Sequence, residues 1–300
     1  MANDEMALDD RGHRGADGAS GARIGESDRH LPRTDWWAEG KGILILILAV
    51  LGFHSLVAKP FYIPSESMLP TLEVGDRLVV SKYPYGYSWV TPTFHILPPM
   101  HGRLFGHMPK RGDIVIAVPP GTHTDYIKRV IGLPGDRIAV AGGVVYLNGQ
   151  KIERQHMPDR MIPIDGNTRC DPREYPGRTV RGYDGKLYCR LPIYRETLPG
   201  GRSYDTVDLG PSIGDDYPEI TVPPNHVFLM GDNRDNSADS RFSRAQNGLG
   251  GPVPWENIGG RAEFITFSLD GNASWNPLSW PDAFRPGRAG MSLHPESKQP

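Results

Sequence analysis

Residues 125–136 read Asp-Tyr-Ile-Lys-Arg-Val-Ile-Gly-Leu-Pro-Gly-Asp, a β-strand pattern closed by turn-forming residues. Side chains alternate between the two faces of a strand, so Lys128 and Arg129 point to opposite sides. One of these basic residues must therefore point where the apolar residues are buried. A buried lysine loses solvation, which disfavours its charged form and lowers its pKa. The stretch predicts either a lysine able to act as a general base or an edge-strand lysine that discourages aggregation.

Short β-branched runs recur on both sides of this stretch, separated by Gly, Pro and Asp. Asn148-Gly149 is a hairpin-turn signal. No helical periodicity appears after residue 58, and the pattern predicts a β fold. The expected strands cover residues 77–81, 113–118, 126–131, 137–140, 144–147, 227–230 and 261–268.

Hydrophobic density falls between residues 150 and 224, where Gly, Pro, Arg and Tyr become frequent. We expect a loop-rich subdomain, here called the insertion, that splits a β core into 59–149 and 225–285. The insertion contains Cys170 and Cys189, with no further Cys or His pair that would complete a zinc motif. The two cysteines predict a disulfide if the region lies outside the cytosol, or otherwise two free thiols. Residues 286–300 are polar and predict a flexible tail.

The N-terminal part of the chain divides into a polar and an apolar segment. Residues 1–35 are polar and predict a disordered tail. Residues 42–58 are aliphatic apart from His54 and Ser55, and a tryptophan pair precedes them, which predicts a single transmembrane anchor. A cleaved signal peptide and a buried soluble helix are the alternatives. Basic residues favour a cytoplasmic tail with the rest of the chain across the membrane; they are Arg23, Arg29, Arg33 and Lys41 before the run, against Lys59 and Arg77 after it.

Composition leaves room for one large domain or two smaller ones. The 300 residues carry a formal net charge of −2, so no nucleic-acid footprint is expected. Gly 36 and Pro 29 favour turns and short strands over long helices.

Two polar segments have the character of a site. Residues 63–72 read Ile-Pro-Ser-Glu-Ser-Met-Leu-Pro-Thr-Leu, so Ser65 and Ser67 lie in a loop stiffened by prolines, close to the expected membrane anchor. An ordinary turn has the same composition. Residues 231–241 read Gly-Asp-Asn-Arg-Asp-Asn-Ser-Ala-Asp-Ser-Arg, which is too polar for packed core. This segment predicts either a solvated turn or the surroundings of a catalytic group.

Several catalytic templates are absent from the sequence. It contains no Gly-x-Ser-x-Gly elbow, His-Glu-x-x-His zinc helix or Walker phosphate loop. His123 and His226 are candidates for a Ser-His-Asp triad, but no local pattern selects either. We therefore expect neither a metal nor a cofactor.

Taken together, these segments resemble the bacterial type I signal peptidase family, membrane-anchored serine proteases that remove signal peptides. Four of the family's sequence boxes are matched in order, and the apolar run resembles the membrane anchor that precedes them. The resemblance covers roughly residues 42–140 and 225–268. The boxes lie at residues 64–72, 111–116, 126–136 and 231–241.

The resemblance implies a Ser-Lys dyad. Ser67 would be the nucleophile and Lys128 the neutral general base. Ser237 would hold the lysine amine by a hydrogen bond. The Ser67 backbone N–H and the Ser65 hydroxyl would form the oxyanion hole. Supporting ion pairs would come from Arg129, Asp232, Asp239 and Arg241. Glu66 stands where the family often has Gly, although the family also accepts Glu.

The same resemblance implies shallow substrate pockets that select small residues, with the peptide extended along a sheet edge. These pockets would be lined by Phe61, Ile63, Met68, Leu72, Tyr126 and Ile127, which are equally suited to core packing. The implied fold is all-β, with an antiparallel catalytic core and an inserted cap, which favours a Cys170–Cys189 disulfide in an oxidising compartment. The implied partners are signal peptides of secretory preproteins and the lipid bilayer of the cytoplasmic membrane, with the catalytic domain on the periplasmic side. No oligomeric state is implied.

Three other functions fit parts of the pattern. A dedicated peptidase that matures conjugation pilins would have the same boxes. Self-cleaving SOS repressors share Ser-Lys chemistry, but they lack an anchor and carry a DNA-binding domain. A catalytically dead peptide-binding domain would have no reason to retain Ser67, Lys128 and Ser237 together.

Overall fold

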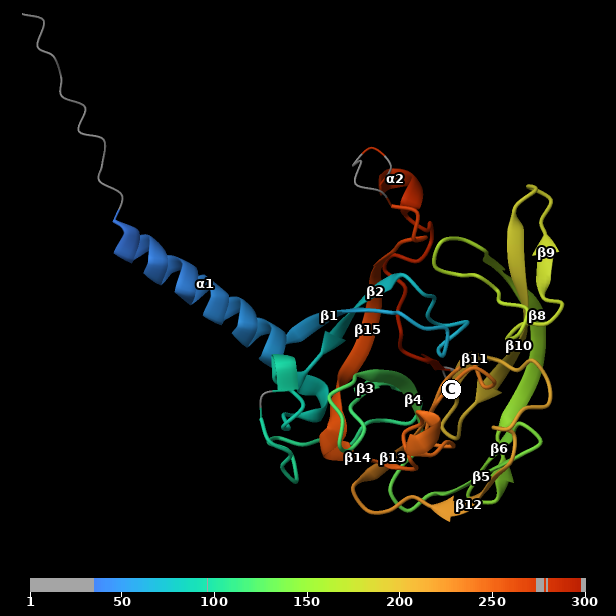
Figure 1. Cartoon of the computed structure of the whole chain (residues 1–300). Helices are drawn as coiled ribbons and strands as arrows, with labels where there is room; N and C mark the ends of the chain where they lie inside the picture. Colours follow the sequence, from blue (N-terminus) through green and yellow to red (C-terminus); the bar gives the residue numbers. More distant parts are fainter. Residues whose placement is uncertain (1–34, 96, 274–277, 279, 298–300) are drawn as a thin grey trace, which may run out of the picture. The chain divides into compact units, whose positions relative to one another are not determined.

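The computed structural model describes residues 35–95, 97–273, 278 and 280–297 (Figure 1). The chain divides into a first unit that ends at Ile43 and a second unit that begins at Leu44. The expected disordered tail lies outside the described residues, apart from Asp35.

Helix α1 (Trp36–Leu56) has 21 residues and is the one described helix long and apolar enough to cross a membrane. It begins before the apolar run because Asp35 caps it. The Asp35 carboxylate accepts hydrogen bonds from the backbone N–H groups of Trp37 and Ala38, at 3.1 and 3.3 Å. The tryptophan pair therefore belongs to the helix, and α1 is suited to anchor the chain in a membrane.

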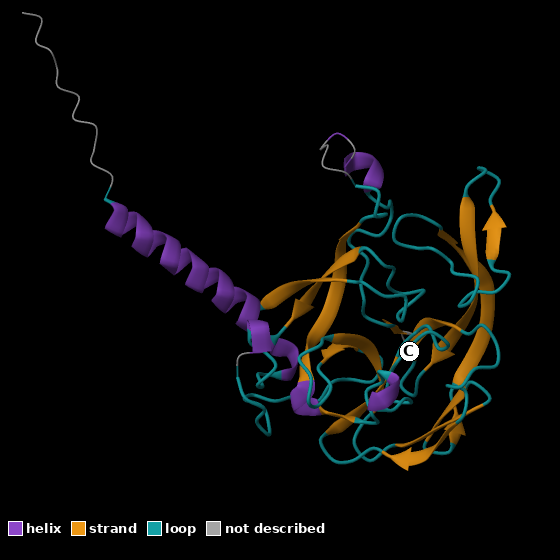
Figure 2. Cartoon of the chain, viewed as in Figure 1, coloured by secondary structure: helices purple, strands orange, loops and turns teal. Residues whose placement is uncertain are grey.

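Strands outnumber helices in the second unit, and loops join them (Figure 2). The largest sheet has seven strands in the order β1-β2-β15-β3-β4-β13-β14, and every neighbouring pair is antiparallel. The predicted all-β, antiparallel fold is confirmed. Its strands are β1 (Ala58–Tyr62), β2 (Asp76–Ser81), β3 (Ile114–Ala117), β4 (Tyr126–Gly132), β13 (His226–Met230), β14 (Val253–Pro254) and β15 (Ile258–Ser268).

Two further sheets complete the second unit. A four-stranded sheet has the order β12-β5-β6-β7, and a five-stranded sheet has the order β16-β11-β10-β8 with β9 paired to β10. Their strands are β5 (Arg137–Ala141), β6 (Val144–Leu147), β7 (Gln150–Lys151), β8 (Glu153–Pro163), β9 (Thr179–Arg181), β10 (Leu187–Thr197), β11 (Arg202–Val207), β12 (Tyr217–Thr221) and β16 (Glu296–Ser297). The described helical turns are η1 (Tyr83–Tyr85), η2 (Thr93–His95), η3 (Arg244–Gln246), η4 (Trp255–Asn257) and α2 (Trp280–Ala283).

The insertion differs from the expected loop-rich subdomain. Strands β8 and β10 have 11 residues each and pair over most of their length. Most β8 side chains are exposed or half-buried, which explains why its sequence has low hydrophobic density. The expected boundaries also fall inside a sheet, because β5 and β6 of the predicted core pair with β12 and β7 of the insertion. The hairpin predicted at Asn148-Gly149 joins β6 to β7, with both residues at positive φ.

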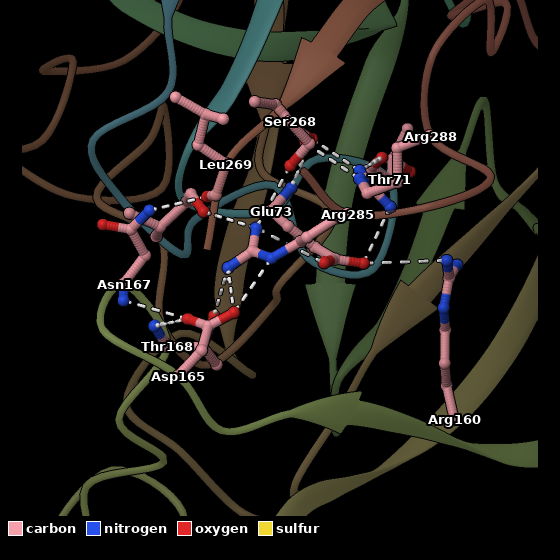
Figure 3. Close-up of polar contacts among 12 residues, drawn as sticks. Thr71, Glu73, Arg160, Asp165, Asn167, Thr168, Ser268, Leu269, Arg285 and Arg288 are labelled. Carbon is pink, nitrogen blue, oxygen red and sulfur yellow. Dashed lines mark hydrogen bonds and ion pairs between the residues drawn. The ribbon is translucent and has the colours of Figure 1, made fainter. Parts of the chain in front are cut away.

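The C-terminal segment packs into the core instead of forming a flexible tail over all of residues 286–300. Leu293 joins the main hydrophobic cluster, and Arg288 is 5% exposed. The Arg288 guanidinium donates to Asp76 at 2.8 Å and to Glu73 at 2.7 Å. Figure 3 shows Arg285 and Arg288 converging on Glu73 from the C-terminal segment. Residues 298–300 lie outside the described part of the chain.

Candidate active site

Strand β4 carries Lys128 and Arg129 in a buried environment on both of its faces. Lys128 is 3% exposed and Arg129 is 1% exposed. The strand lies between β3 and β13 in the largest sheet, so it is not an edge strand. The sequence required one of the two to be buried, and the structure buries both. An edge-strand role for Lys128 is therefore wrong.

Lys128 meets Ser67 across the site. Its Nζ donates to Ser67 Oγ at 2.8 Å and to the carbonyl oxygen of Ile127 at 2.9 Å. The Ser65 hydroxyl lies 3.4 Å from Ser67 Oγ. Met68 and Leu72, both fully buried, fix the loop that follows the nucleophile candidate. Lys128 lies 61 positions from Ser67 in the sequence, and the fold brings it together with Ser65 and Ser67 in one site.

The electrostatic environment of Lys128 favours a neutral amine. Burial is the largest cause and lowers its pKa to about 8, opposed by the negative charges of Asp239 and Asp232 and assisted by Arg241. A lysine with this pKa can accept a proton near neutral pH, whereas an exposed lysine remains almost fully charged.

Ser237 lies beside the serine loop but does not make the hydrogen bond expected with Lys128. Its side chain is 5% exposed, and its Oγ has no hydrogen-bond partner among the described residues. Gly231 separates it from the serine loop: a Cβ on Gly231 would lie 2.1 Å from Ser237 Oγ and 2.5 Å from the carbonyl oxygen of Ser67. The structure therefore brings Ser237 close to the backbone of Ser67, while the Lys128 amine bonds to Ser67 and Ile127 instead.

Substituting Gly231 with alanine is expected to lower kcat by about 10- to 100-fold, since displacement of a reacting group by about 1 Å has costs of this size. The new methyl group would lie 2.5 Å from both Ser237 Cβ and the Ser67 carbonyl oxygen, and side-chain rotation moves neither atom, so the backbone must shift. Peptide-cleavage kinetics of the full chain would measure the effect. Gly259→Ala is the matched control, because a Cβ there would meet its nearest atoms at an ordinary 3.7 Å. Equal activity of both variants would contradict the expected role of Gly231.

Arg129, the neighbour of Lys128 in β4, forms a buried ion pair with Asp232 through two hydrogen bonds. The guanidinium donates from Nε to Oδ1 at 2.7 Å and from a terminal nitrogen to Oδ2 at 2.6 Å. Asp232 Oδ2 also accepts from the hydroxyl of Thr71 at 2.6 Å, which ties the pair to the serine loop. The pair therefore joins β4, the 231–241 segment and the serine loop.

Arg241 and Asp239 form a second buried pair within the 231–241 segment. Arg241 Nε donates to Asp239 Oδ1 at 3.0 Å, and the Gly231 backbone N–H donates to Asp239 Oδ2 at 3.0 Å. Burial alone would raise the pKa of Asp239, but the charge and hydrogen bonds of Arg241 outweigh it and hold that pKa below its ordinary value. The segment is folded by its own charges and is not a solvated turn.

Sequence reasoning missed the partners that the insertion supplies. Arg234 donates to Glu196 of β10 at 2.6 Å, and the Tyr175 hydroxyl donates to Glu66 at 2.6 Å. Glu196 and Tyr175 stand in no motif, so no local signal marks them. The bonded pair Cys170–Cys189 lies in the same region, with an S–S distance of 2.01 Å.

The residues expected to line substrate pockets lie mainly in the core. Ile63, Met68, Leu72 and Ile127 are buried in one hydrophobic cluster, with Phe61 packed against it. Tyr126 packs against another cluster and donates its hydroxyl to the Asn247 carbonyl at 3.1 Å. Across the described residues, no group of three or more His, Cys, Asp or Glu side chains is placed to hold a metal ion.

Comparison with known proteins agrees with this arrangement. A family model described as "Signal peptidase, peptidase S26" matches residues 36–267. The signal peptidase I of Rickettsia typhi is 38% identical over 74% of this chain and 77% of its own length, and that of Rickettsia akari is 35% identical over 79% and 80%. A solved signal peptidase I from Enterococcus faecalis V583 is 21% identical and covers 52% of this chain and 97% of its own, but its TM-score of 0.26 carries no weight here. By the family model and the relatives' identity, the chain belongs to the signal peptidase family, peptidase S26.

Proposed function

We propose that this chain is a signal peptidase I, a serine endopeptidase that removes N-terminal signal peptides from exported preproteins. The observation that carries the proposal is the contact of 2.8 Å between the buried Lys128 amine and Ser67 Oγ. The names of its relatives support the substrate class.

The proposed mechanism begins when neutral Lys128 takes the proton of Ser67 as the Ser67 oxygen attacks the scissile carbonyl carbon. The Ser67 N–H and the Ser65 hydroxyl stabilise the negative charge that develops on the carbonyl oxygen. Protonated Lys128 then gives its proton to the leaving amine, which leaves the signal peptide esterified to Ser67. Lys128 next takes a proton from water as the water attacks this ester. It returns that proton to Ser67 Oγ as the ester bond breaks, which releases the signal peptide and restores Ser67 and neutral Lys128.

In the proposed complex the signal peptide lies extended against the sheet that contains β1. That strand stands at the edge of the largest sheet and carries Phe61 beside the core cluster of Ile63 and Ile127. Bulky side chains at these positions leave room for only small residues near the cut.

We further propose that α1 anchors the enzyme in the cytoplasmic membrane with the β-sheet unit on the periplasmic side. The excess of basic residues on the N-terminal side of the apolar run 42–58 favours this orientation. The Cys170–Cys189 disulfide is typical of an oxidising compartment and supports it.

The test is cleavage of a purified preprotein by the full chain in detergent, compared with Ser67→Ala. We expect the wild type to release the mature protein with a single new N-terminus and Ser67→Ala to release none above background. Undiminished cleavage by Ser67→Ala would overturn the proposed nucleophile, and failure of the wild type to cut any preprotein at its signal-peptide boundary would overturn the substrate class.

A further inference from the structure

One tyrosine of the insertion reaches the residue between the two serines. Tyr175 is 1% exposed, and its hydroxyl donates to Glu66 Oε2 at 2.6 Å. Glu66 stands directly between Ser65 and Ser67 in the chain. A glycine at this position could not accept the bond, so the contact depends on the glutamate that this chain carries.

Asn233 extends the contact to the backbone of the nucleophile. Its Nδ2 donates to the Tyr175 hydroxyl at 3.0 Å and to the Glu66 carbonyl oxygen at 3.1 Å. The Glu66 carbonyl and the Ser67 N–H belong to the same planar peptide group, so holding the first orients the second. The Asn233 N–H also donates to the Ser67 carbonyl at 3.2 Å. Both peptide groups that flank Ser67 are thereby held.

The disulfide fixes Tyr175 in its place. Cys170, Cys189 and Tyr175 are buried in one cluster with Leu69, which lies two positions after Ser67. The Tyr175 N–H donates to the Asp171 carbonyl at 2.7 Å, in the turn that follows Cys170. The bonded cysteines thus pack against the nucleophile loop and also constrain the segment that delivers the tyrosine.

The environment of Tyr175 and Glu66 keeps the tyrosine hydroxyl as the hydrogen-bond donor and the glutamate carboxylate as the acceptor. Burial, with the negative charge of Glu66, raises the pKa of Tyr175, so its hydroxyl keeps its proton and donates. Burial also raises the pKa of Glu66, and the Tyr175 hydrogen bond opposes that rise by stabilising the carboxylate. A hydrogen bond to a charged acceptor is shorter and stronger than one between neutral groups.

We propose that Tyr175 and Glu66 form a positioning pair through which the disulfide segment, residues 170–189, orients the Ser67 peptide group toward the developing oxyanion. The inference rests on the proposed function, because it assigns that N–H to the oxyanion hole. Neither side chain touches the reacting atoms. Both act through Asn233 and Ser67, so their loss lowers kcat and leaves substrate binding unchanged.

The experiment compares Tyr175→Phe, Glu66→Gly, their double variant and Glu66→Gln in the full chain in detergent. We expect Tyr175→Phe and Glu66→Gly each to lower kcat per active site by about tenfold and to leave KM unchanged. Misplacing a reacting group by about 1 Å can cost up to about 100-fold. The double variant should lose no more than either single variant, since both remove one interaction. Glu66→Gln keeps an acceptor oxygen and should stay near the wild-type rate. Active sites are counted from the burst of first product, which separates a slower site from a smaller folded fraction.

Tyr188→Phe is the matched control, because the Tyr188 hydroxyl donates to Asp184 at 2.8 Å on an exposed surface of the same insertion. It should leave kcat unchanged. Replacing both cysteines with serine should lower kcat in the wild type and add nothing to Tyr175→Phe. The proposed pair is overturned if Tyr175→Phe keeps the wild-type kcat per active site, or if the losses of the two single variants add up in the double variant. Inactivity of Ser67→Ala would then leave the proposed function standing. An active Ser67→Ala would overturn the pair and the proposed function together.

Discussion

Lys128→Ala is expected to lower kcat for preprotein cleavage by at least about 100-fold and by up to about 10,000-fold, the range that general-base catalysis supplies. The amine of Lys128 lies 2.8 Å from Ser67 Oγ, and in the described structure that oxygen has only the Ser65 hydroxyl as another hydrogen-bond neighbour. Without the lysine, the Ser67 hydroxyl has no adjacent group able to take its proton. Single-turnover cleavage in detergent would measure the loss. The exposed Lys151→Ala serves as control. Equal rates for the two variants would remove Lys128 from the mechanism.

The pH dependence of the wild type provides a second measurement of the same group. Only the neutral form of Lys128 can accept the proton, so kcat/KM should rise with pH and level off above about 8. The folded pKa lies below the unfolded value, so the unfolded chain binds more protons between them. The free energy of unfolding contributed by this group should therefore rise as pH increases from about 8 to 10.5. A rate that stays constant as the pH is raised through this pKa would contradict the assignment.

Asp232→Ala is expected to lower the free energy of unfolding by about 3–5 kcal/mol, the cost of leaving one partner of a buried ion pair uncompensated. Arg129 would keep its charge at 1% exposure and lose both bonds to the carboxylate. Thr71 would lose its acceptor as well, so the loop that carries Ser67 should loosen.

Chemical denaturation of the full chain in detergent, followed by tryptophan fluorescence, would measure this loss. Asp205→Ala is the control, because the Arg195–Asp205 pair is about one-third exposed on both sides. Its removal should change stability by less than about 1 kcal/mol. An equal loss of unfolding free energy in both variants would show that the buried Arg129–Asp232 pair contributes no more stability than the part-exposed Arg195–Asp205 pair.

Local sequence was sufficient where residues adjacent in the chain determine the structure. Runs of β-branched residues predicted β2, β3, β4, β13 and β15 of the largest sheet but not β1 or β14. Asn148-Gly149 predicted the hairpin turn between β6 and β7 of the four-stranded sheet. A basic residue buried within residues 126–131 was also predictable. That Lys128 and Arg129 would both be buried was not, because it depends on β3 and β13 pairing on either side of β4.

The remaining features depend on contacts between distant residues. Polar side chains on long, half-exposed strands made the insertion look like loops, although β8 and β10 pair regularly. Arg288 appeared to belong to a polar tail because its partners Asp76 and Glu73 lie 212 and 215 positions away. Ser237 shows the limit of motif reasoning: its place beside the serine loop follows from the motif, but its expected bond to Lys128 does not appear.

The contacts of Arg288 in the C-terminal segment also bear on the order in which the enzyme folds during synthesis. Arg288 donates to the Thr71 carbonyl at 3.1 Å, across 217 positions of the chain (Figure 3). A contact of this range forms late, because the intervening chain must be made and its ends brought together first. During synthesis, both residues of the proposed dyad leave the ribosome long before Arg288, whose side chain holds the loop at Thr71. A chain interrupted before residue 288 would carry Ser67 and Lys128 but would lack this closing contact.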